Sequence, residues 1–174
     1  MALSNKVQTI GSKAFYECSN LRSLTFTSGN SITLVDSEAF SNSGITQFLG
    51  FALLREIRTK AFYNCTSLSK VSFADKEIES IKECALKVIG SGVFYGCTSL
   101  SSIKIPITEG LTIPTDVFGN STSNYTGRKT YNSGTNMLYV FQDKADLFSG
   151  SGWDTLLDSE KCGFTISATL NLEV

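Results

Sequence analysis

The chain of 174 residues contains no histidine and only two prolines. The absence of histidine excludes Ser-His-Asp and Cys-His catalytic arrangements, zinc sites built on imidazole, and the usual acid or base that titrates near neutral pH. The longest apolar stretches, such as residues 48–54, are far shorter than the roughly 20 residues that a membrane-spanning helix needs. The sequence therefore predicts no membrane insertion and leaves few routes to catalysis.

The chain also lacks an excess of charge of either sign, with 16 acidic and 15 basic side chains and a net charge of −1. A bulk electrostatic attraction to nucleic acid is therefore not expected. With 41% hydrophobic and 18% charged residues the composition is that of a globular protein, and the length suits about one domain. The first residues lack the basic and apolar regions of a secretory signal.

An internal repeat is the most informative feature of the sequence. Residues 10–26 return as residues 57–73 and 89–106, and weaker copies cover residues 35–48 and 113–118. The third and fourth motif phenylalanines are 32 residues apart, and the segment around Cys84 between them is expected to be either a truncated extra copy or a bulge before the copy at Ile89. The five motif phenylalanines are Phe15, Phe40, Phe62, Phe94 and Phe118.

A unit of this length cannot bury its own apolar face, so the copies must stack into a solenoid. In Leu21-x-x-Leu24-x-Phe26 the last two apolar residues have the spacing of a strand, which predicts one parallel strand per coil. The Ala-Phe-x-x-Cys step favours a short 3₁₀ or α turn that packs the phenylalanine inward. A second apolar pair precedes each motif and is expected to line the opposite wall: Val7 and Ile10, Ile32 and Val35, Leu54 and Ile57, Leu86 and Ile89.

These copies closely resemble the BspA type of leucine-rich repeat over about residues 7–118, with serine replacing the motif cysteine at Ser43 and Ser121. The resemblance implies a β-rich, right-handed leucine-rich-repeat solenoid. We expect about five coils over residues 1–118, with a parallel sheet on one face and short turns on the other. The resemblance to this family further implies a secreted or cell-surface protein that takes part in adhesion and host-protein binding, without catalytic activity.

Residues 119–174 lose the period and are predicted to form a C-terminal cap, because the end of a solenoid otherwise exposes its core and strand edges. We expect strands at 137–141 and 163–166, a short helix at 143–148, and a turn that contains Trp153. The family often closes with a similar strand, helix and Trp-containing turn. The N-terminal end shows no comparable cap, which suggests either a truncated longer array or self-association through this end.

The five cysteines include no Cys-x-x-Cys pair, so no metal site and no cofactor are predicted. Cys18, Cys65 and Cys97 share one repeat position and are expected to form a buried column of free thiols. Cys18 and Cys65 would lie two coils apart, roughly 10 Å, which is too far for a disulfide. Cys65 with Cys97, or either of them with Cys84, could come close enough.

Four acidic residues between positions 75 and 83 raise the possibility of a carbohydrate-active enzyme, since an acid and a base carboxylate can work without histidine. Lysines at 76 and 82 alternate with them, which is typical of a solvated loop. The glycines of 90–92 lack the lysine and spacing of a phosphate-binding loop and fit a repeat turn. The four acidic residues are Asp75, Glu77, Glu79 and Glu83.

The outward positions of the repeat strands form the better candidate site. They are rich in hydroxyl groups, carry Arg and Lys without an acid, and contain one apolar residue. The repeat strands place no Tyr or Trp on this face, which argues against stacking on sugars or bases and favours a protein partner. The predicted partner-binding residues are Arg22, Thr25, Gln47, Leu49, Lys70, Ser72, Ser102 and Lys104.

From the sequence we therefore predict a non-enzymatic protein-binding or adhesion module. Its expected partner is an extracellular-matrix or host-cell surface protein, and its expected location is extracellular or at the cell surface. Two alternatives stay open: a carbohydrate-active enzyme on a β-solenoid, and a structural spacer in a longer surface protein.

Overall fold

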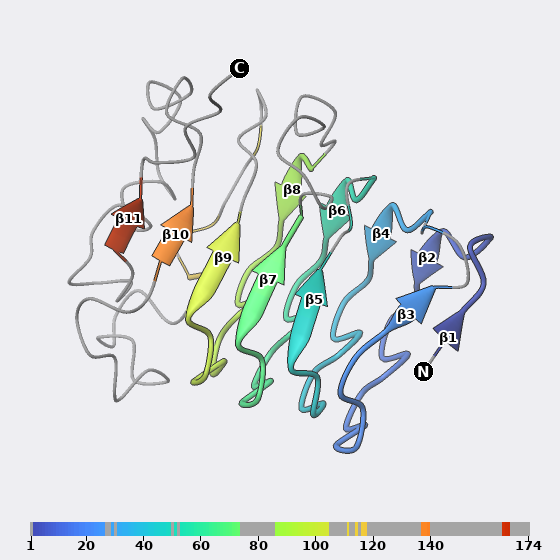
Figure 1. The fold of residues 1–174 in the computed structure, drawn as a ribbon, viewed down its shortest axis with the longest axis horizontal. Helices are drawn as coiled ribbons and strands as arrows, with labels where there is room; N and C mark the ends of the chain where they lie inside the picture. The colour runs from blue at the N-terminus through green and yellow to red at the C-terminus, as the bar shows by residue number, and fades with distance from the viewer. Residues whose placement is uncertain are drawn as a thin grey trace.

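A computed structural model describes residues 2–26, 29, 31–49, 51, 53–73, 86–104, 111, 114, 116–117, 137–139 and 165–167. Short parallel strands succeed one another along a solenoid (Figure 1). We number its coils by residues: coil 1 is 7–26, coil 2 is 32–49, coil 3 is 54–73 and coil 4 is 86–104. Each coil runs through a strand of one wall, a turn, and then a strand of the other wall, as predicted for stacked repeats.

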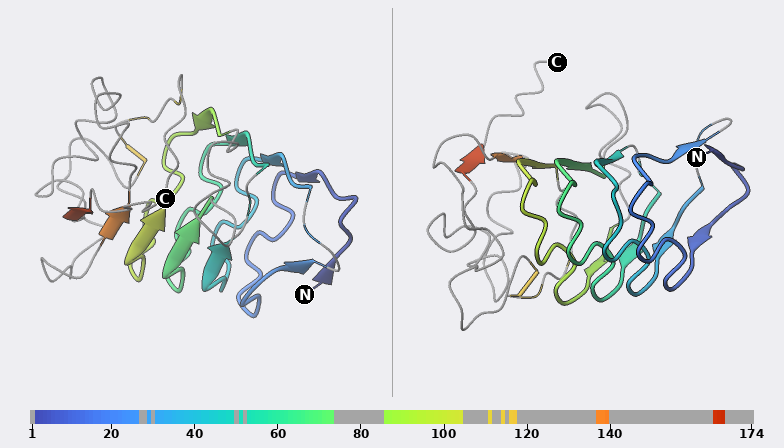
Figure 2. Two further views of the ribbon diagram at one scale, coloured as in Figure 1. Left: turned by 45° about the horizontal axis from the view of Figure 1, so that its top comes forward. Right: turned by 90° about the horizontal axis from the view of Figure 1, so that it is seen from below.

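The apolar pairs that precede each motif build the second wall. Their strands are β2 (Thr9–Ile10), β4 (Leu34–Val35), β6 (Glu56–Ile57) and β8 (Val88–Ile89), paired in that order in one parallel sheet. The predicted opposite wall is thus confirmed, but it is a second sheet rather than turns alone. Figure 2 shows the two rows of strands on separate sides of the solenoid.

The leucine-rich strands build the first wall as a five-stranded parallel sheet. In spatial order it contains β5 (Gln47–Leu49), β7 (Lys70–Ser72), β9 (Ser102–Lys104), β10 (Met137–Tyr139) and β11 (Thr165–Ser167). Strands were expected at 137–141 and 163–166, and the structure describes strands at 137–139 and 165–167, which continue the repeat sheet. The helix expected at 143–148 and the turn at Trp153 lie outside the described residues.

Coil 1 departs from this arrangement. Its strand β3 (Thr25–Phe26) pairs with β1 (Ala2–Leu3) in a separate two-stranded sheet and not with β5. Coils 1 and 2 remain joined at the start of the strand, where the backbone N–H and the hydroxyl of Thr46 donate to the Arg22 carbonyl at 2.9 and 3.0 Å. The prediction that the strand of coil 1 shares one sheet with the others is wrong.

The turns between the two walls are not 3₁₀ or α helices, as the sequence suggested, and no described residue is helical. Successive N–H groups alternate in direction. The Phe40 N–H donates to Ala61 O in the next coil at 2.8 Å, and the Ser41 N–H donates to Glu38 O in its own coil at 3.0 Å. Each turn holds two residues with positive φ, which a right-handed helix excludes: Lys13 and Glu17, Glu38 and Asn42, Lys60 and Asn64, Gly92 and Gly96.

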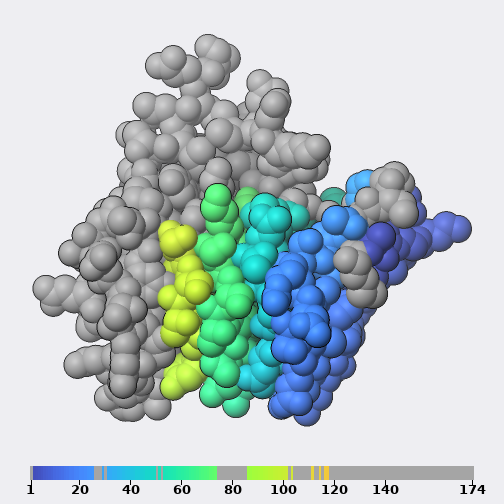
Figure 3. Space-filling model, turned by 60° about the horizontal axis from the view of Figure 1, so that its bottom comes forward, coloured from blue at the N-terminus to red at the C-terminus, as the bar shows by residue number. Residues whose placement is uncertain are grey.

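A ladder of phenylalanines fills the core between the walls. The rings of Phe15, Phe40, Phe62 and Phe94 stack in sequence, with centroids 5.1, 5.0 and 5.7 Å apart. Phe48 of β5 packs edge-on against Phe40 and Phe62. The inward placement is confirmed for Phe40, Phe62 and Phe94, which are buried, and for Phe15, which is half-buried, whereas Phe118 lies outside the described residues. The coils that these rings anchor lie side by side as bands on the surface (Figure 3).

Candidate functional site

The outward positions of three neighbouring strands of the first wall form a continuous surface, which we call the sheet face. Side chains alternate between the two sides of a strand. The central residues Phe48, Val71 and Ile103 are buried in the core, and on β5 and β7 their strand neighbours lie on the outer side, exposed or half-buried. On β9 the parallel register aligns the positions of Ser102 and Lys104 with these neighbours. The sheet face consists of Gln47, Leu49, Lys70, Ser72, Ser102 and Lys104.

The strand register aligns these six positions in two rows that cross the strands. One row is Gln47, Lys70 and Ser102, and the other is Leu49, Ser72 and Lys104. Gln47 and Lys70 are exposed, Ser72 is half-buried, and Leu49 leaves 43% of its surface in water. Because adjacent strands lie about 4.8 Å apart, each row presents three positions within about 10 Å. Six of the eight predicted site residues therefore occupy one surface.

The other two predicted site residues are placed differently. Thr25 lies on β3, in the separate sheet. The Arg22 guanidinium donates from Nη1 to the carbonyls of Ser19 at 2.7 Å and Gly44 at 3.2 Å. A side chain at Gly44 would collide with Ser19 O and with Arg22 Nη1, which explains the glycine. Arg22 therefore joins coils 1 and 2.

Charge is distributed unequally between the two walls. Strands β5, β7 and β9 contain Lys70 and Lys104 and no acidic residue. Among the ion pairs of the described residues none includes Lys70. Among the described side chains of the sheet face, the positive charge of Lys70 is thus left without an acidic partner.

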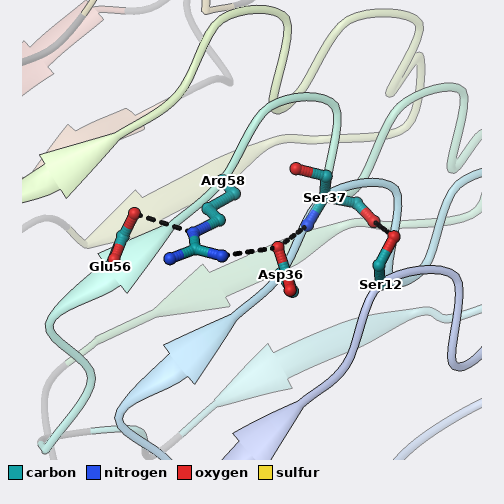
Figure 4. Close-up of polar contacts among 5 residues, drawn as sticks. All are labelled: Ser12, Asp36, Ser37, Glu56 and Arg58. Carbon is teal, nitrogen blue, oxygen red and sulfur yellow. Dashed lines mark hydrogen bonds and ion pairs between the residues drawn. The ribbon is translucent and has the colours of Figure 1, made fainter.

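The second wall, in contrast, compensates its charge internally. Arg58 donates to Asp36 Oδ1 at 3.1 Å and to Glu56 Oε1 at 2.9 Å, and the Ser37 N–H donates to Asp36 Oδ1 at 2.7 Å (Figure 4). The Ser37 N–H lowers the pKa of Asp36, and Arg58 adds to this effect. These groups are exposed or half-buried, and Arg58 pairs with Glu56 in its own coil and with Asp36 in the preceding coil.

The cysteine column is confirmed for two of its three members. Cys65 and Cys97 are fully buried, and their thiols donate to the carbonyls of Phe40 and Phe62 at 2.9 and 3.0 Å. Burial raises the pKa of Cys65 to about 11, so the reactive thiolate is disfavoured. Cys18 was expected to be buried as well, and this is wrong because no described coil covers the N-terminal side of coil 1.

The described part of the chain contains no group of three or more His, Cys, Asp or Glu residues that could hold a metal ion. The acidic residues between 75 and 83, on which the enzymatic alternative depends, lie outside the described residues, as do Cys84 and Cys162. That alternative therefore stays a prediction.

The sequence reasoning did not weigh a row of tyrosines that follows the motif phenylalanines. Tyr63 and Tyr95 stack with centroids 5.1 Å apart, and the ammonium groups of Lys13 and Lys60 lie 5.3 and 5.4 Å from the rings of Tyr16 and Tyr63. Their constant position directly after the phenylalanine was the available signal. These half-buried rings lie on the turns of coils 1, 3 and 4, and Ser41 occupies the same position in coil 2.

The strand register also continues the two rows past residue 118, where the sequence period is lost. Met137 pairs with Ser102, and Tyr139 pairs with Lys104. The absence of tyrosine from the face was inferred from the repeat strands alone, and Tyr139 occupies a position in the second row.

Comparison with known families matches the BspA type leucine-rich repeat region, in six copies over residues 1–124 and 83–142. The comparisons with curated proteins and with solved structures found no match. In the described part of the chain, no helix has the length and apolar character to cross a membrane. Both the match and the sheet extend past residue 118, where the sequence period is lost. The chain belongs to the BspA type of leucine-rich repeat proteins.

Proposed function

We propose that this chain is a non-enzymatic protein-binding module that engages an acidic patch on a partner protein through the sheet face. The observation that carries the proposal is the pair of rows in parallel register across β5, β7 and β9. An extended surface of adjacent parallel strands is what solenoids commonly use to bind proteins.

The chemistry of the face indicates the kind of partner. Lys70 and Lys104 supply positive charge, the serines and Gln47 supply hydrogen-bonding groups, and Leu49 supplies an apolar contact of limited size. Complementary charge favours encounter and register more than raw affinity. We therefore infer a salt-sensitive interaction with a protein outside the cell or at a cell surface, in keeping with the family, and a role in adhesion.

The test uses an array of purified extracellular-matrix proteins, with immobilised poly-glutamate as a probe of the charge contribution. The Lys70→Glu/Lys104→Glu variant should lose at least tenfold in affinity for any captured protein. The matched control is Lys6→Glu/Lys60→Glu, which changes net charge equally at two exposed lysines outside the sheet face. Equal losses in both variants would show a bulk charge effect and overturn the assignment, as would unchanged binding in the first variant.

Arg22 is left out of the decisive variant because its guanidinium holds two coils together. A loss of binding in Arg22→Ala could not be assigned to binding alone, because the substitution also removes the contact between coils 1 and 2. Leu49→Ser provides a third, uncharged variant, which should weaken binding by a few fold without altering its salt dependence.

A further inference from the structure

The N-terminal side of coil 1 presents hydrogen-bonding groups in the pattern of a contact between coils. We call this surface, formed by residues 8–18, the coil 1 end face. Inside the solenoid, three turn carbonyls of coil 2 accept N–H groups from coil 1: Ser37 from Lys13 at 3.2 Å, Ala39 from Phe15 at 2.7 Å, and Ser41 from Glu17 at 2.9 Å.

The same carbonyl row recurs in coil 3, where Thr59, Ala61 and Tyr63 accept from coil 2. The equivalent carbonyls of coil 1 accept no backbone N–H from any residue that the structure describes. They belong to Ser12, Ala14 and Tyr16. The end face therefore offers a row of three backbone acceptors.

Two donors complete the pattern. The N–H of Asp36 donates to Ile10 O at 2.9 Å, but the equivalent N–H of Gly11 has no acceptor among the described residues. The Cys65 thiol donates to a carbonyl of the coil before it, whereas Cys18 is exposed.

Space is available where a coil would pack. A β-carbon built on Gly11 meets nothing within 4 Å, whereas one on the equivalent Gly90 would lie 2.5 Å from Thr59 N of the preceding coil. Phe15 is only half-buried, although Phe40 and Phe62 in the same ladder are completely buried. Apolar contact and hydrogen bonding are thus incomplete on the same surface.

The carbonyl row contains only hydrogen-bond acceptors, so its binding partner must supply donors. Two end faces brought together would set acceptors against acceptors, which leaves the row without donors. A coil that presents its other side offers the turn N–H groups found at the positions of Lys13, Phe15 and Glu17. We propose that the coil 1 end face docks a further coil of the same repeat, which enters with the side that carries its turn N–H groups. This inference excludes symmetric self-association through this end and is independent of the proposed function.

Strand β1 determines how such a coil can be joined. Ala2 pairs with Thr25, whose equivalent in coil 2 is Leu49, so β1 already occupies the place of the strand on the first wall. Only a strand of the second wall and a turn are missing. A copy of residues 32–48 placed directly before Ala2 supplies both, and it adds no thiol because coil 2 carries Ser43 at the cysteine position.

The test compares the unmodified chain, the chain extended by this copy, and a control extended by the same residues in scrambled order. The rate at which Cys18 reacts with a thiol reagent is measured by peptide mass spectrometry. The ordered extension should slow this reaction at least tenfold and protect the new turn amides from hydrogen exchange, and the scrambled extension should do neither. Equal Cys18 rates in the two extended chains would overturn the proposal.

Unreactive Cys65 and Cys97 in every chain establish that the host fold is intact. If the first extension disturbs it, a copy of residues 54–71 with Cys65→Ser in the copy repeats the test with a different coil. Protection of Cys18 in the unmodified chain at high concentration, together with a dimeric mass, would also overturn the proposal, because a second copy of the chain would then close this face.

Discussion

The Cys65 thiol donates a hydrogen bond of 2.9 Å to the backbone carbonyl of Phe40 in the preceding coil. The hydroxyl of Ser43, which occupies the cysteine position of that coil, lies 3.6 Å from the Cys65 sulfur. A small side chain with one hydrogen to donate is what this position requires. Cysteine and serine therefore substitute for each other between repeats, as the sequence shows at Ser43.

This contact predicts a pH dependence of stability. Burial raises the pKa of Cys65 from 9.0 to about 11 in the folded chain. Below about pH 9 both states keep the proton, and between about pH 9 and 11 the unfolded state loses it first, so stability falls as pH rises. The loss should amount to about 2–3 kcal/mol by pH 11. Urea unfolding at several pH values measures it.

Cys65→Ser is the matched control, because serine does not titrate in this range and the structure already accommodates it at Ser43. The two proteins differ only at residue 65, so the difference between their stability curves reports on the Cys65 thiol. Identical slopes of stability against pH in the two proteins would contradict the prediction.

Two glycines at the same repeat position predict opposite responses to alanine. At Gly90 the new β-carbon would lie 2.5 Å from Thr59 N and 2.7 Å from the Arg58 carbonyl carbon, whereas at Gly11 it meets nothing within 4 Å. Gly90→Ala should cost about 1–3 kcal/mol through overpacking against the backbone. Gly11→Ala should be neutral or stabilise by up to about 1 kcal/mol. Thermal unfolding compares them, and a loss of similar size in both would be inconsistent with this packing.

The left-handed turn positions give a third prediction. Gly92 and Gly96 have φ of 61° and 74°, and a β-carbon on Gly96 would also lie 3.1 Å from the Cα of Asn64. Gly92→Ala should cost about 1–2 kcal/mol for the left-handed conformation, and Gly96→Ala should cost more. Lys60→Gly, at φ 57°, should be neutral or mildly stabilising. A smaller loss for Gly96→Ala than for Gly92→Ala in chemical unfolding would refute this order.

Sequence periodicity predicted the coils well because burial repeats with the motif. The inward side of Phe40, Phe62 and Phe94, both walls, and the register of Gln47 with Lys70 follow from apolar spacing alone. The turn conformation could not be predicted, since Lys13, Glu38 and Lys60 occupy left-handed positions that their residue types do not indicate.

Only part of the sheet face was predicted correctly, because the sequence pattern does not determine strand pairing. Periodicity assigns an inner and an outer side to each strand, but it does not say which strands pair. Thr25 carries the same pattern as Leu49, and yet its strand pairs with β1 on the N-terminal side and does not pair with β5. The role of Arg22 was likewise hidden, because its carbonyl partners on Ser19 and Gly44 leave no trace in side-chain patterns.

The phenylalanine ladder predicts that a substitution at its centre destabilises the solenoid more than a substitution at its N-terminal end. Phe62 stacks between Phe40 and Phe94 and is fully buried, so Phe62→Ala should cost about 3–5 kcal/mol. Phe15 stacks on Phe40 and is half-buried at the end face, so Phe15→Ala should cost about half as much. Urea unfolding measures both, and Cys65 reactivity shows where the fold opens. Phe62→Ala should expose Cys65 because the ladder is broken at its centre, whereas Phe15→Ala should leave Cys65 protected. Exposure of Cys65 to the same degree in both variants would mean that the coils unfold as one unit. The central position of Phe62 in the ladder would then not determine where the fold opens.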